Sequence, residues 1–253
     1  MKTVKSDHNR RLVMRHLRDT RIEPLDKDFP HSALISRATY SPWYADAAFM
    51  EVFERIQGLT LVDIYRCHEL WDLLRQTANV AGDVIEVGVW KGGTGLLAAK
   101  RLAQLESTKH LLLCDTFCGV VKAGANDTLY QGGEHADTSL ESVAALLEGE
   151  QLKDRATLLQ GIFPEQTGSE AEERRFSFCH IDVDTYQSAK DIFEWVTPRL
   201  NRHGVIVFDD YGFWGCEGVA RLVEDLADHP EYFLLRNLNG HAVMLKLTEA
   251  SHV

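Results

Sequence analysis

The sequence predicts an α/β protein whose core is a seven-stranded, mostly parallel sheet that ends in an antiparallel hairpin. From about Gly82 onward, short apolar runs alternate with segments whose apolar residues recur at helical spacing, a pattern typical of a parallel sheet wrapped by helices. Near the C-terminus, two further apolar runs flank Asn239 and Gly240, a dipeptide that favours a hairpin turn because it tolerates positive φ. Five strand–helix units closed by this hairpin account for the seven strands.

The predicted elements follow one another in a regular order. Apolar runs mark five parallel strands, at residues 84–89, 111–114, 156–159, 176–181 and 205–208. Helices are predicted over residues 94–105 and 188–200, because the apolar residues of each segment share one helical face. A T-x-x-E pattern at Thr138 and Glu141 resembles a capping box and predicts the start of another helix. The strands of the closing hairpin are predicted at residues 232–235 and 242–247.

Residues 1–80 precede this alternation and are predicted to form a helical cover, with residues 81–253 as the main domain. Apolar residues recur at helical spacing from Phe49 to Ile56 and again over residues 61–74. We expect these two segments to lie as helices over the open edge of the sheet, where they would act as a lid or as a subunit contact.

The composition is that of a soluble globular protein and narrows the range of partners. The hydrophobic content is 45% and the charged content is 26%, both ordinary values. A net charge of −11 argues against a nucleic acid or an anionic membrane surface as the main partner. The five cysteines form no C-x-x-C pair, so we expect no zinc site and a reducing, cytoplasmic location. No signal peptide or membrane span is expected from the sequence.

Two pairs of aspartates follow two of the predicted strands. Asp182 and Asp184 come after the fourth apolar run, and Asp209 and Asp210 come after the fifth. In an open α/β sheet, the carboxyl ends of the strands form the edge where ligands bind. Carboxylates crowded there repel one another unless a cation neutralises them, and oxygen ligands suit Mg²⁺, Mn²⁺ or Ca²⁺ better than Zn²⁺. The pattern favours a hard-metal site, with turn and helix-cap aspartates as the alternative.

The segment DVIEVGVWKGGTG, residues 83–95, predicts a strand, a glycine-rich turn and the start of a helix. Glycines such as Gly88 allow a ligand to approach the backbone, and the helix start presents N–H groups that attract a carboxylate or a phosphate. Neither the GxGxxG pattern nor a P-loop is present. Glu86 lies inside the apolar strand, where a buried carboxylate needs a partner. The ammonium group of a methionine-like ligand would supply one.

Two further residues are candidates for ligand binding. Asp115 ends the second predicted strand, where acidic residues of nucleotide-binding α/β folds accept hydrogen bonds from ribose hydroxyls. The alternative for Asp115 is that it caps the following turn. Thr94 begins the predicted helix, so it either binds the carboxylate of the methionine-like ligand or caps the helix.

Several motifs in register resemble those of one enzyme family. They are DVIEVGVWKGGTG, LLCDTF, LLQGIFPE, HIDVDTYQS and VIVFDDYGFWGCEG, with SPWYADAAF and GLTLVDIYR upstream. Over residues 40–247 the chain resembles the macrocin O-methyltransferase (TylF/MycF-like) family. The resemblance implies a Rossmann-like class I methyltransferase fold, and a Mg²⁺-dependent transfer of a methyl group from S-adenosylmethionine to a sugar hydroxyl in antibiotic or surface-polysaccharide pathways.

The resemblance extends the set of expected site residues. Gly161, Ile162 and Phe163 would flank the adenine, with a place in the core as the alternative for Phe163. With the residues named above, the expected S-adenosylmethionine contacts are Glu86, Gly88, Thr94, Asp115, Thr116, Gly161, Ile162, Phe163 and Asp182. A more distant similarity to catechol O-methyltransferase implies that Asp182, Asp209 and Asp210 hold the Mg²⁺ or Mn²⁺ ion.

The catalytic base is less directly indicated. The lysine that acts in catechol O-methyltransferase corresponds to Thr185 here, so another residue must take its place. Asp182 is the first candidate, because it lies between the metal and the cofactor edge, and Asp184 is the second. His135 is the third, in a long glycine-rich segment at residues 120–135 that we expect to be a mobile substrate loop.

The sequence therefore favours a sugar O-methyltransferase, in which the metal lowers the pKa of a very weakly acidic sugar hydroxyl. The expected substrate is a glycosylated small molecule or a nucleotide sugar, and the expected assembly is a homodimer or higher homo-oligomer. Two alternatives remain open: a phenol or catechol O-methyltransferase, and a nucleotide-sugar-binding protein without catalysis. A metal-dependent hydrolase is a third, but it leaves Glu86 and the glycine-rich turn unexplained.

Overall fold

The computed structural model describes residues 38–249. The chain divides into two units, Met1–Ala45 and Asp46–Val253. The described part of the first unit contains the short 3-10 helix η1 (Pro42–Ala45), and the other helices and strands belong to the second unit. Among the helices within residues 38–249, none is long and apolar enough to cross a membrane.

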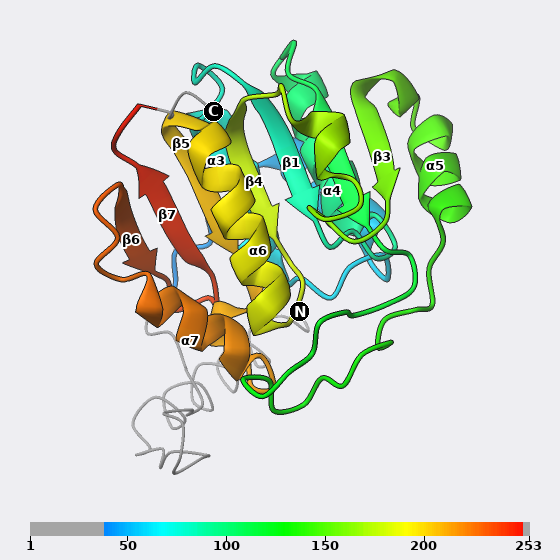
Figure 1. Ribbon diagram of the computed structural model, residues 1–253. Coiled ribbons are helices and arrows are strands. Elements are labelled where there is room, and N and C mark those ends of the chain that lie inside the picture. The colour runs from blue at the N-terminus through cyan, green and yellow to red at the C-terminus, as the bar shows by residue number, and fades with distance from the viewer. Residues whose placement is uncertain (1–37, 250–253) are drawn as a thin grey trace, which may run out of the picture. The chain divides into compact units, whose positions relative to one another are not determined.

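The second unit is built on one seven-stranded sheet of order β3-β2-β1-β4-β5-β7-β6 (Figure 1). The strands are β1 (Asp83–Val87), β2 (Leu111–Asp115), β3 (Ala156–Gln160), β4 (Phe176–Ile181), β5 (Leu200–Phe208), β6 (Tyr232–Arg236) and β7 (Ala242–Lys246). The first five run parallel, and β7 is antiparallel to both β5 and β6. The predicted sheet and its closing hairpin are confirmed.

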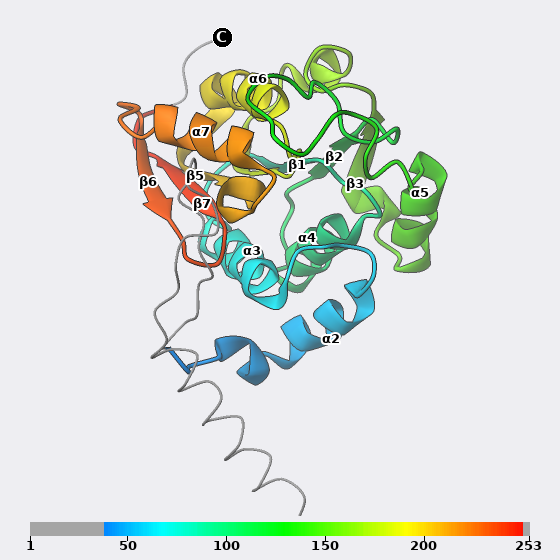
Figure 2. The ribbon, with the colours of Figure 1, turned by 90° about the horizontal axis from the view of Figure 1, so that it is seen from below.

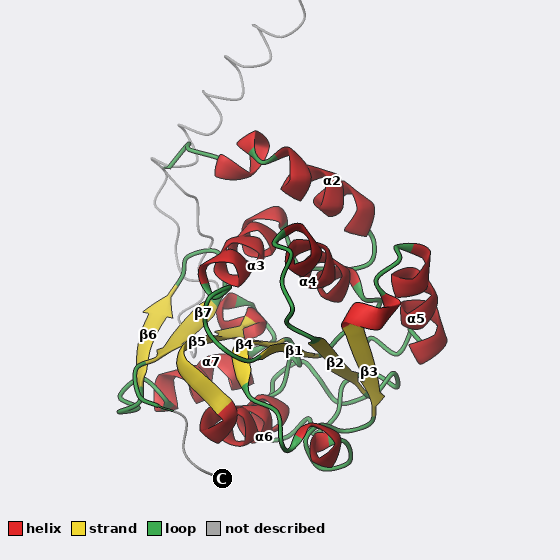
Figure 3. Ribbon diagram, turned by 90° about the horizontal axis from the view of Figure 1, so that it is seen from above, coloured by secondary structure: helices red, strands yellow, loops and turns green. Residues whose placement is uncertain are grey.

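Helices cover both faces of the sheet. They are α2 (Ala47–Ile56), α3 (Ile64–Gln76), α4 (Gly93–Gln104), α5 (Leu140–Gly149), α6 (Tyr186–Val196) and α7 (Glu217–Asp225). Figures 2 and 3 show α3 and α4 on one face, with α2 packed outside them, and α6 and α7 on the other face. The helix α3 thus covers one face of the sheet beside α4, and α2 packs outside this layer, so neither lies at the open edge where it was expected. Their role as a lid stays a prediction.

Two predicted helix ends are displaced in the structure. The helix α6 ends at Val196, before residue 200, because Pro198 in the next 3-10 turn has no N–H to continue the helix. The helix α5 begins at Leu140, and its N-cap is Ser139, which forms a capping box with Ser142. The predicted box at Thr138 and Glu141 is therefore wrong by one position. The Thr138 hydroxyl instead donates to the Trp90 carbonyl.

The register of the central strands brings the predicted acidic positions together. Val87 of β1 pairs with Ile181 of β4, and Ile181 pairs with Phe208 of β5. The residues that follow these strands therefore emerge side by side, with Asp182 next to Asp209. All six residues of β4 are buried, so the edge rests directly on the interior of the protein.

Candidate active site

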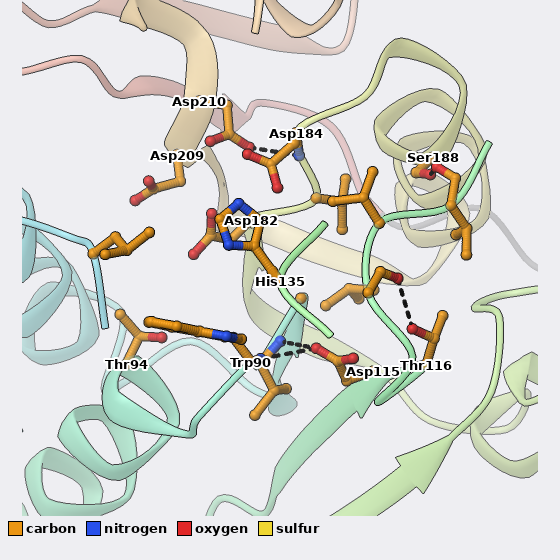
Figure 4. A pocket seen from close by; sticks show the side chains of 18 of the residues that line it. Trp90, Thr94, Asp115, Thr116, His135, Asp182, Asp184, Ser188, Asp209 and Asp210 are labelled. Atoms are coloured by element: carbon orange, nitrogen blue, oxygen red, sulfur yellow. Dashed lines mark hydrogen bonds between the residues drawn. The ribbon is translucent and has the colours of Figure 1, made fainter. Parts of the chain in front are cut away.

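A pocket of about 320 Å³ opens at the carboxyl ends of the parallel strands, at the edge where such sheets bind ligands. Its walls include all four aspartates of the two predicted clusters, together with His135 from the long loop and Trp90 from the glycine-rich turn (Figure 4). Of the nine predicted cofactor contacts, eight line it: Gly88, Thr94, Asp115, Thr116, Gly161, Ile162, Phe163 and Asp182.

Glu86 is the predicted contact that does not line the pocket. It is buried in β1, where one carboxylate oxygen accepts a hydrogen bond from the Thr94 hydroxyl and lies 3.2 Å from Nδ1 of His180. Its other oxygen is buried without a hydrogen-bond partner among the described residues. Glu86 therefore stands one layer behind Thr94, which faces the pocket, and its direct contact with a cofactor stays a prediction.

Gly88 is required by the sheet itself. Its φ is +94°, and a Cβ atom there would lie 1.7 Å from the carbonyl oxygen of Asp182, so a larger residue would separate β1 from β4. The Asp182 N–H also donates to the Val87 carbonyl at 2.9 Å. The tight turn after β1 thus holds the cofactor wall against the first acidic residue of the predicted metal site.

Asp115 ends β2 and holds two turns together. Its Oδ2 accepts hydrogen bonds from the N–H groups of Val89 and Trp90 at 2.6 and 2.8 Å, and its Oδ1 accepts one from Phe117 at 2.6 Å. The turn-capping alternative therefore applies. A carboxylate oxygen has two lone pairs, so Oδ1 retains capacity for a ribose hydroxyl, and the two roles are compatible.

The residues that follow β3 line the pocket and also pack into the core. Gly161, Ile162 and Phe163 line the cavity, and the Gly161 N–H donates to the Asp115 carbonyl at 2.9 Å. The Phe163 ring is buried and packs edge-on against Trp195, with the ring centroids 4.8 Å apart. Phe163 thus serves the core while it lines the predicted adenine end.

Asp182, Asp209 and Asp210 each place a carboxylate oxygen within 4.8 Å of those of the other two. Burial raises the pKa of Asp182 well above its usual value, and the charges of Asp209 and Asp210 raise it further. Burial, Asp184 and Asp209 do the same to the pKa of Asp210. An all-oxygen set in which the carboxylates repel one another fits a hard divalent cation.

Asp209 differs from its neighbours. Burial acts to raise its pKa, but hydrogen bonds from His180 and His241 and the charge of Arg66 lower it far below its usual value. Arg66 Nη1 contacts Oδ2, while Nε2 of His241 and Nε2 of His180 lie 2.8 and 3.3 Å from Oδ1. Asp209 is therefore the member of the cluster whose negative charge is already compensated by neighbouring protein groups.

Asp184 occupies a strained position beside the acidic cluster. Its φ is +63°, a conformation that non-glycine residues seldom adopt, and its N–H donates to Oδ2 of Asp210 at 2.9 Å. Its side chain hydrogen-bonds with Tyr130 and faces the Cys216 thiol at 3.7 Å. The Tyr130 hydroxyl also lies 3.3 Å from Nε2 of His135, so two side chains of the long loop reach the acidic cluster.

Thr185 does not replace the missing lysine. It is fully buried, and its hydroxyl oxygen lies 3.1 Å from the carbonyl oxygen of Val121 and 2.9 Å from the hydroxyl oxygen of Ser188. It does not line the pocket. Thr185 instead fastens the start of the long loop to the end of β4.

Sequence reasoning missed Arg66, His241 and Tyr130. Arg66 and His241 lie in the helix α3 and beside the C-terminal hairpin, and nothing in their local sequence indicates that they meet at Asp209. His180 could have been found from the sequence, because it is a polar residue within a mostly apolar strand, as Glu86 is. The two side chains are paired in register on one face of the sheet.

The strand order, the glycine-rich turn after β1 and the acidic residue that ends β2 define the class I methyltransferase fold. Solved structures with this fold match the chain. The O-methyltransferase NovP aligns with a TM-score of 0.65 and 21% identity over 75% of this chain and 82% of that one. The calicheamicin methyltransferase CalS11 aligns with a TM-score of 0.60 and 21% identity over 82% and 94%.

The chain belongs to the macrocin-O-methyltransferase (TylF) family, whose model matches residues 54–231. It is 30% identical to 8-demethyl-8-(2,3-dimethoxy-alpha-L-rhamnosyl)-tetracenomycin-C 4'-O-methyltransferase of Streptomyces olivaceus over 54% of this chain and 56% of that protein. It is also 30% identical to mycinamicin III 3''-O-methyltransferase of Micromonospora griseorubida, over 66% and 70%. The chain thus matches little more than half the length of the first relative. The family resemblance predicted from the motifs is confirmed.

Proposed function

We propose that this protein transfers a methyl group from S-adenosylmethionine to a sugar hydroxyl on a glycosylated small molecule or a nucleotide sugar, with Mg²⁺ or Mn²⁺ bound beside the acceptor. One observation carries the proposal: in a macrocin-O-methyltransferase chain, Asp182, Asp209 and Asp210 converge within 4.8 Å at the rim of a pocket walled by the glycine-rich turn and Asp115. The activities for which the two relatives are named support O-methylation of natural products.

The cofactor would occupy the half of the pocket between the turn after β1 and the turn after β3. Asp115 would accept a ribose hydroxyl at Oδ1, beside its bonds to the backbone. Thr94 stands at the start of α4, where N–H groups and the helix dipole favour the methionine carboxylate. Thr116, which donates to the Gly119 carbonyl at 2.8 Å, shapes the turn beside the ribose.

The metal would occupy the other half, held by Asp182, Asp209 and Asp210. When bound, a divalent cation lowers the pKa of a sugar hydroxyl and fixes its orientation toward the methyl donor. Asp182 adjoins Gly88 on the cofactor side and Asp209 on the metal side, so it is the residue best placed to accept the hydroxyl proton. Asp184 is the second candidate and His135 the third, because Tyr130 of the long loop contacts both side chains and so places His135 beside the wall that Asp184 lines.

The test is product formation from S-adenosylmethionine with two panels of acceptors, one of glycosides and sugar nucleotides with vicinal hydroxyls and one of small phenols and catechols. We expect S-adenosylhomocysteine and a methylated sugar from the first panel. Turnover of phenols alone would favour the phenol-type enzyme. Binding of sugars with no release of S-adenosylhomocysteine from any acceptor would favour a non-catalytic binding protein.

A further inference from the structure

We propose that Glu69 on α3 and His241 beside the β6–β7 hairpin are positioning residues that hold Asp209 ready for the cation. The inference rests on the proposed function, because it concerns the metal that this function requires. It assigns to α3 a part in the metal site, in addition to covering the sheet.

Glu69 is connected to Asp209 through the imidazole ring of His241. Nδ1 of His241 lies 2.6 Å from Oε2 of Glu69, and Nε2 of the same ring lies 2.8 Å from Oδ1 of Asp209. The His241 side chain has 0% exposure, so the ring has no room to turn away. A flat ring fixed at one nitrogen by a carboxylate fixes the direction of the group at its other nitrogen, as carboxylate–histidine pairs do around metals.

Glu69 also holds the turn from which His241 extends. Its two oxygens accept hydrogen bonds from the side-chain amides of Asn237 and Asn239, the latter at 3.0 Å. Asn239 in turn accepts the His241 N–H at 3.0 Å. The hairpin turn is thereby tied to α3 at several atoms, and Glu69 is the acceptor common to them.

The second oxygen of Asp209 is held from the same helix. Arg66, one turn before Glu69, contacts Oδ2 of Asp209, donates to Asp63 at 2.9 Å and lies over the Phe213 ring at 4.1 Å. Both oxygens of Asp209 are thus oriented by α3, one directly and one through His241. A ligand that is ordered before binding loses less conformational freedom when the cation arrives, so its affinity is higher.

Glu69 offers a sharper test than Arg66. Loss of the Arg66 charge would increase the attraction of the carboxylates for any cation, which opposes the loss of positioning. The Glu69 side chain is 23% exposed, so its replacement leaves no fully buried charge without a partner. In Glu69→Gln the amide oxygen still accepts from His241, and Asn237 can turn its amide over to match. This variant removes the negative charge of Glu69 and keeps the hydrogen bond that orients the His241 ring.

The experiment is titration of the full chain with Mn²⁺, following free Mn²⁺ by electron paramagnetic resonance and checking the heat by calorimetry. We expect Glu69→Ala to bind Mn²⁺ at least about tenfold more weakly than wild type, the scale typical of outer-shell partners of metal ligands, and Glu69→Gln, which keeps the acceptor, to lose less than about tenfold. The matched control is Asp72→Ala, which removes an aspartate one turn further along α3 that bonds to Arg75 and Gln76. It should leave the affinity unchanged.

The outcomes separate the two proposals. Wild-type protein that binds Mn²⁺, with Glu69→Ala binding it equally well, overturns the positioning role and leaves the proposed function standing. Equal losses of Mn²⁺ affinity in Glu69→Ala, Glu69→Gln and Asp72→Ala would show that only the lost negative charge matters. That result would also overturn the positioning role. If wild type binds no Mn²⁺, the metal site itself falls and the inference falls with it. S-adenosylhomocysteine affinity, expected to be unchanged in every variant, confirms that the fold is intact.

Discussion

Replacing Asp115 by alanine is expected to lower the free energy of unfolding of the ligand-free protein. It is also expected to lower the affinity for S-adenosylhomocysteine. The side chain accepts hydrogen bonds from three backbone N–H groups, those of Val89, Trp90 and Phe117. A typical intramolecular hydrogen bond contributes about 0.5–1.5 kcal/mol net, so losing three costs about 1.5–4.5 kcal/mol. For a chain of this size, that lowers Tm by at least about 3 °C.

The effect on binding has a separate origin. A ribose hydroxyl that donates to the remaining lone pair of Oδ1 makes a hydrogen bond to a charged group, so its loss weakens binding by about 1–3 kcal/mol. Thermal unfolding of the ligand-free protein measures the first effect, and calorimetry with S-adenosylhomocysteine at a temperature where the variant is folded measures the second. Asp225→Ala, at an exposed site outside the pocket, is the control and should change neither.

The two measurements can fail independently. Undiminished affinity in Asp115→Ala would remove the ribose assignment while leaving the turn-holding role intact. An unchanged Tm would show that water replaces the carboxylate at all three N–H groups, and the reasoning from hydrogen bonds to stability would be refuted.

Three further predictions concern the acidic cluster. EDTA should abolish methyl transfer and added Mg²⁺ should restore it, while S-adenosylhomocysteine still binds; full activity in excess chelator would refute the metal requirement. Asp210→Asn should leave the metal-free protein as stable as wild type or more so, because it relieves repulsion, whereas Asp209→Asn should cost about 3 kcal/mol by leaving buried Arg66 short of a partner; unfolding experiments in chelator compare the two, and equal stability would contradict the assigned network. At saturating Mg²⁺ and substrate, Asp182→Asn should lose about 10²- to 10⁴-fold in turnover if Asp182 is the base, and more than Asp184→Asn or His135→Ala; the greatest loss in His135→Ala would move the base to the long loop.

The sequence alone was sufficient for the sheet and for the edge at which the site lies. Strand and helix periodicities arise from near neighbours along the chain, so the five parallel strands and the hairpin could be located without coordinates. Asp182 and Asp209 each follow directly on a buried strand, and parallel strands end at a common edge, so their convergence was also predictable. The family followed from several motifs that occur in order along the chain.

Only the tertiary structure distinguished among these residues. Asp209 and Asp210 are adjacent in sequence, yet Arg66, His180 and His241 neutralise the first while the second remains among other carboxylates. The contacts responsible join Asp209 to residues that lie 143, 32 and 29 positions away along the chain. Local pattern cannot encode them, because they depend on which helix packs over which strands and on the register of those strands. For the same reason the sequence could identify the acidic positions, but the fold determined which of them is already paired.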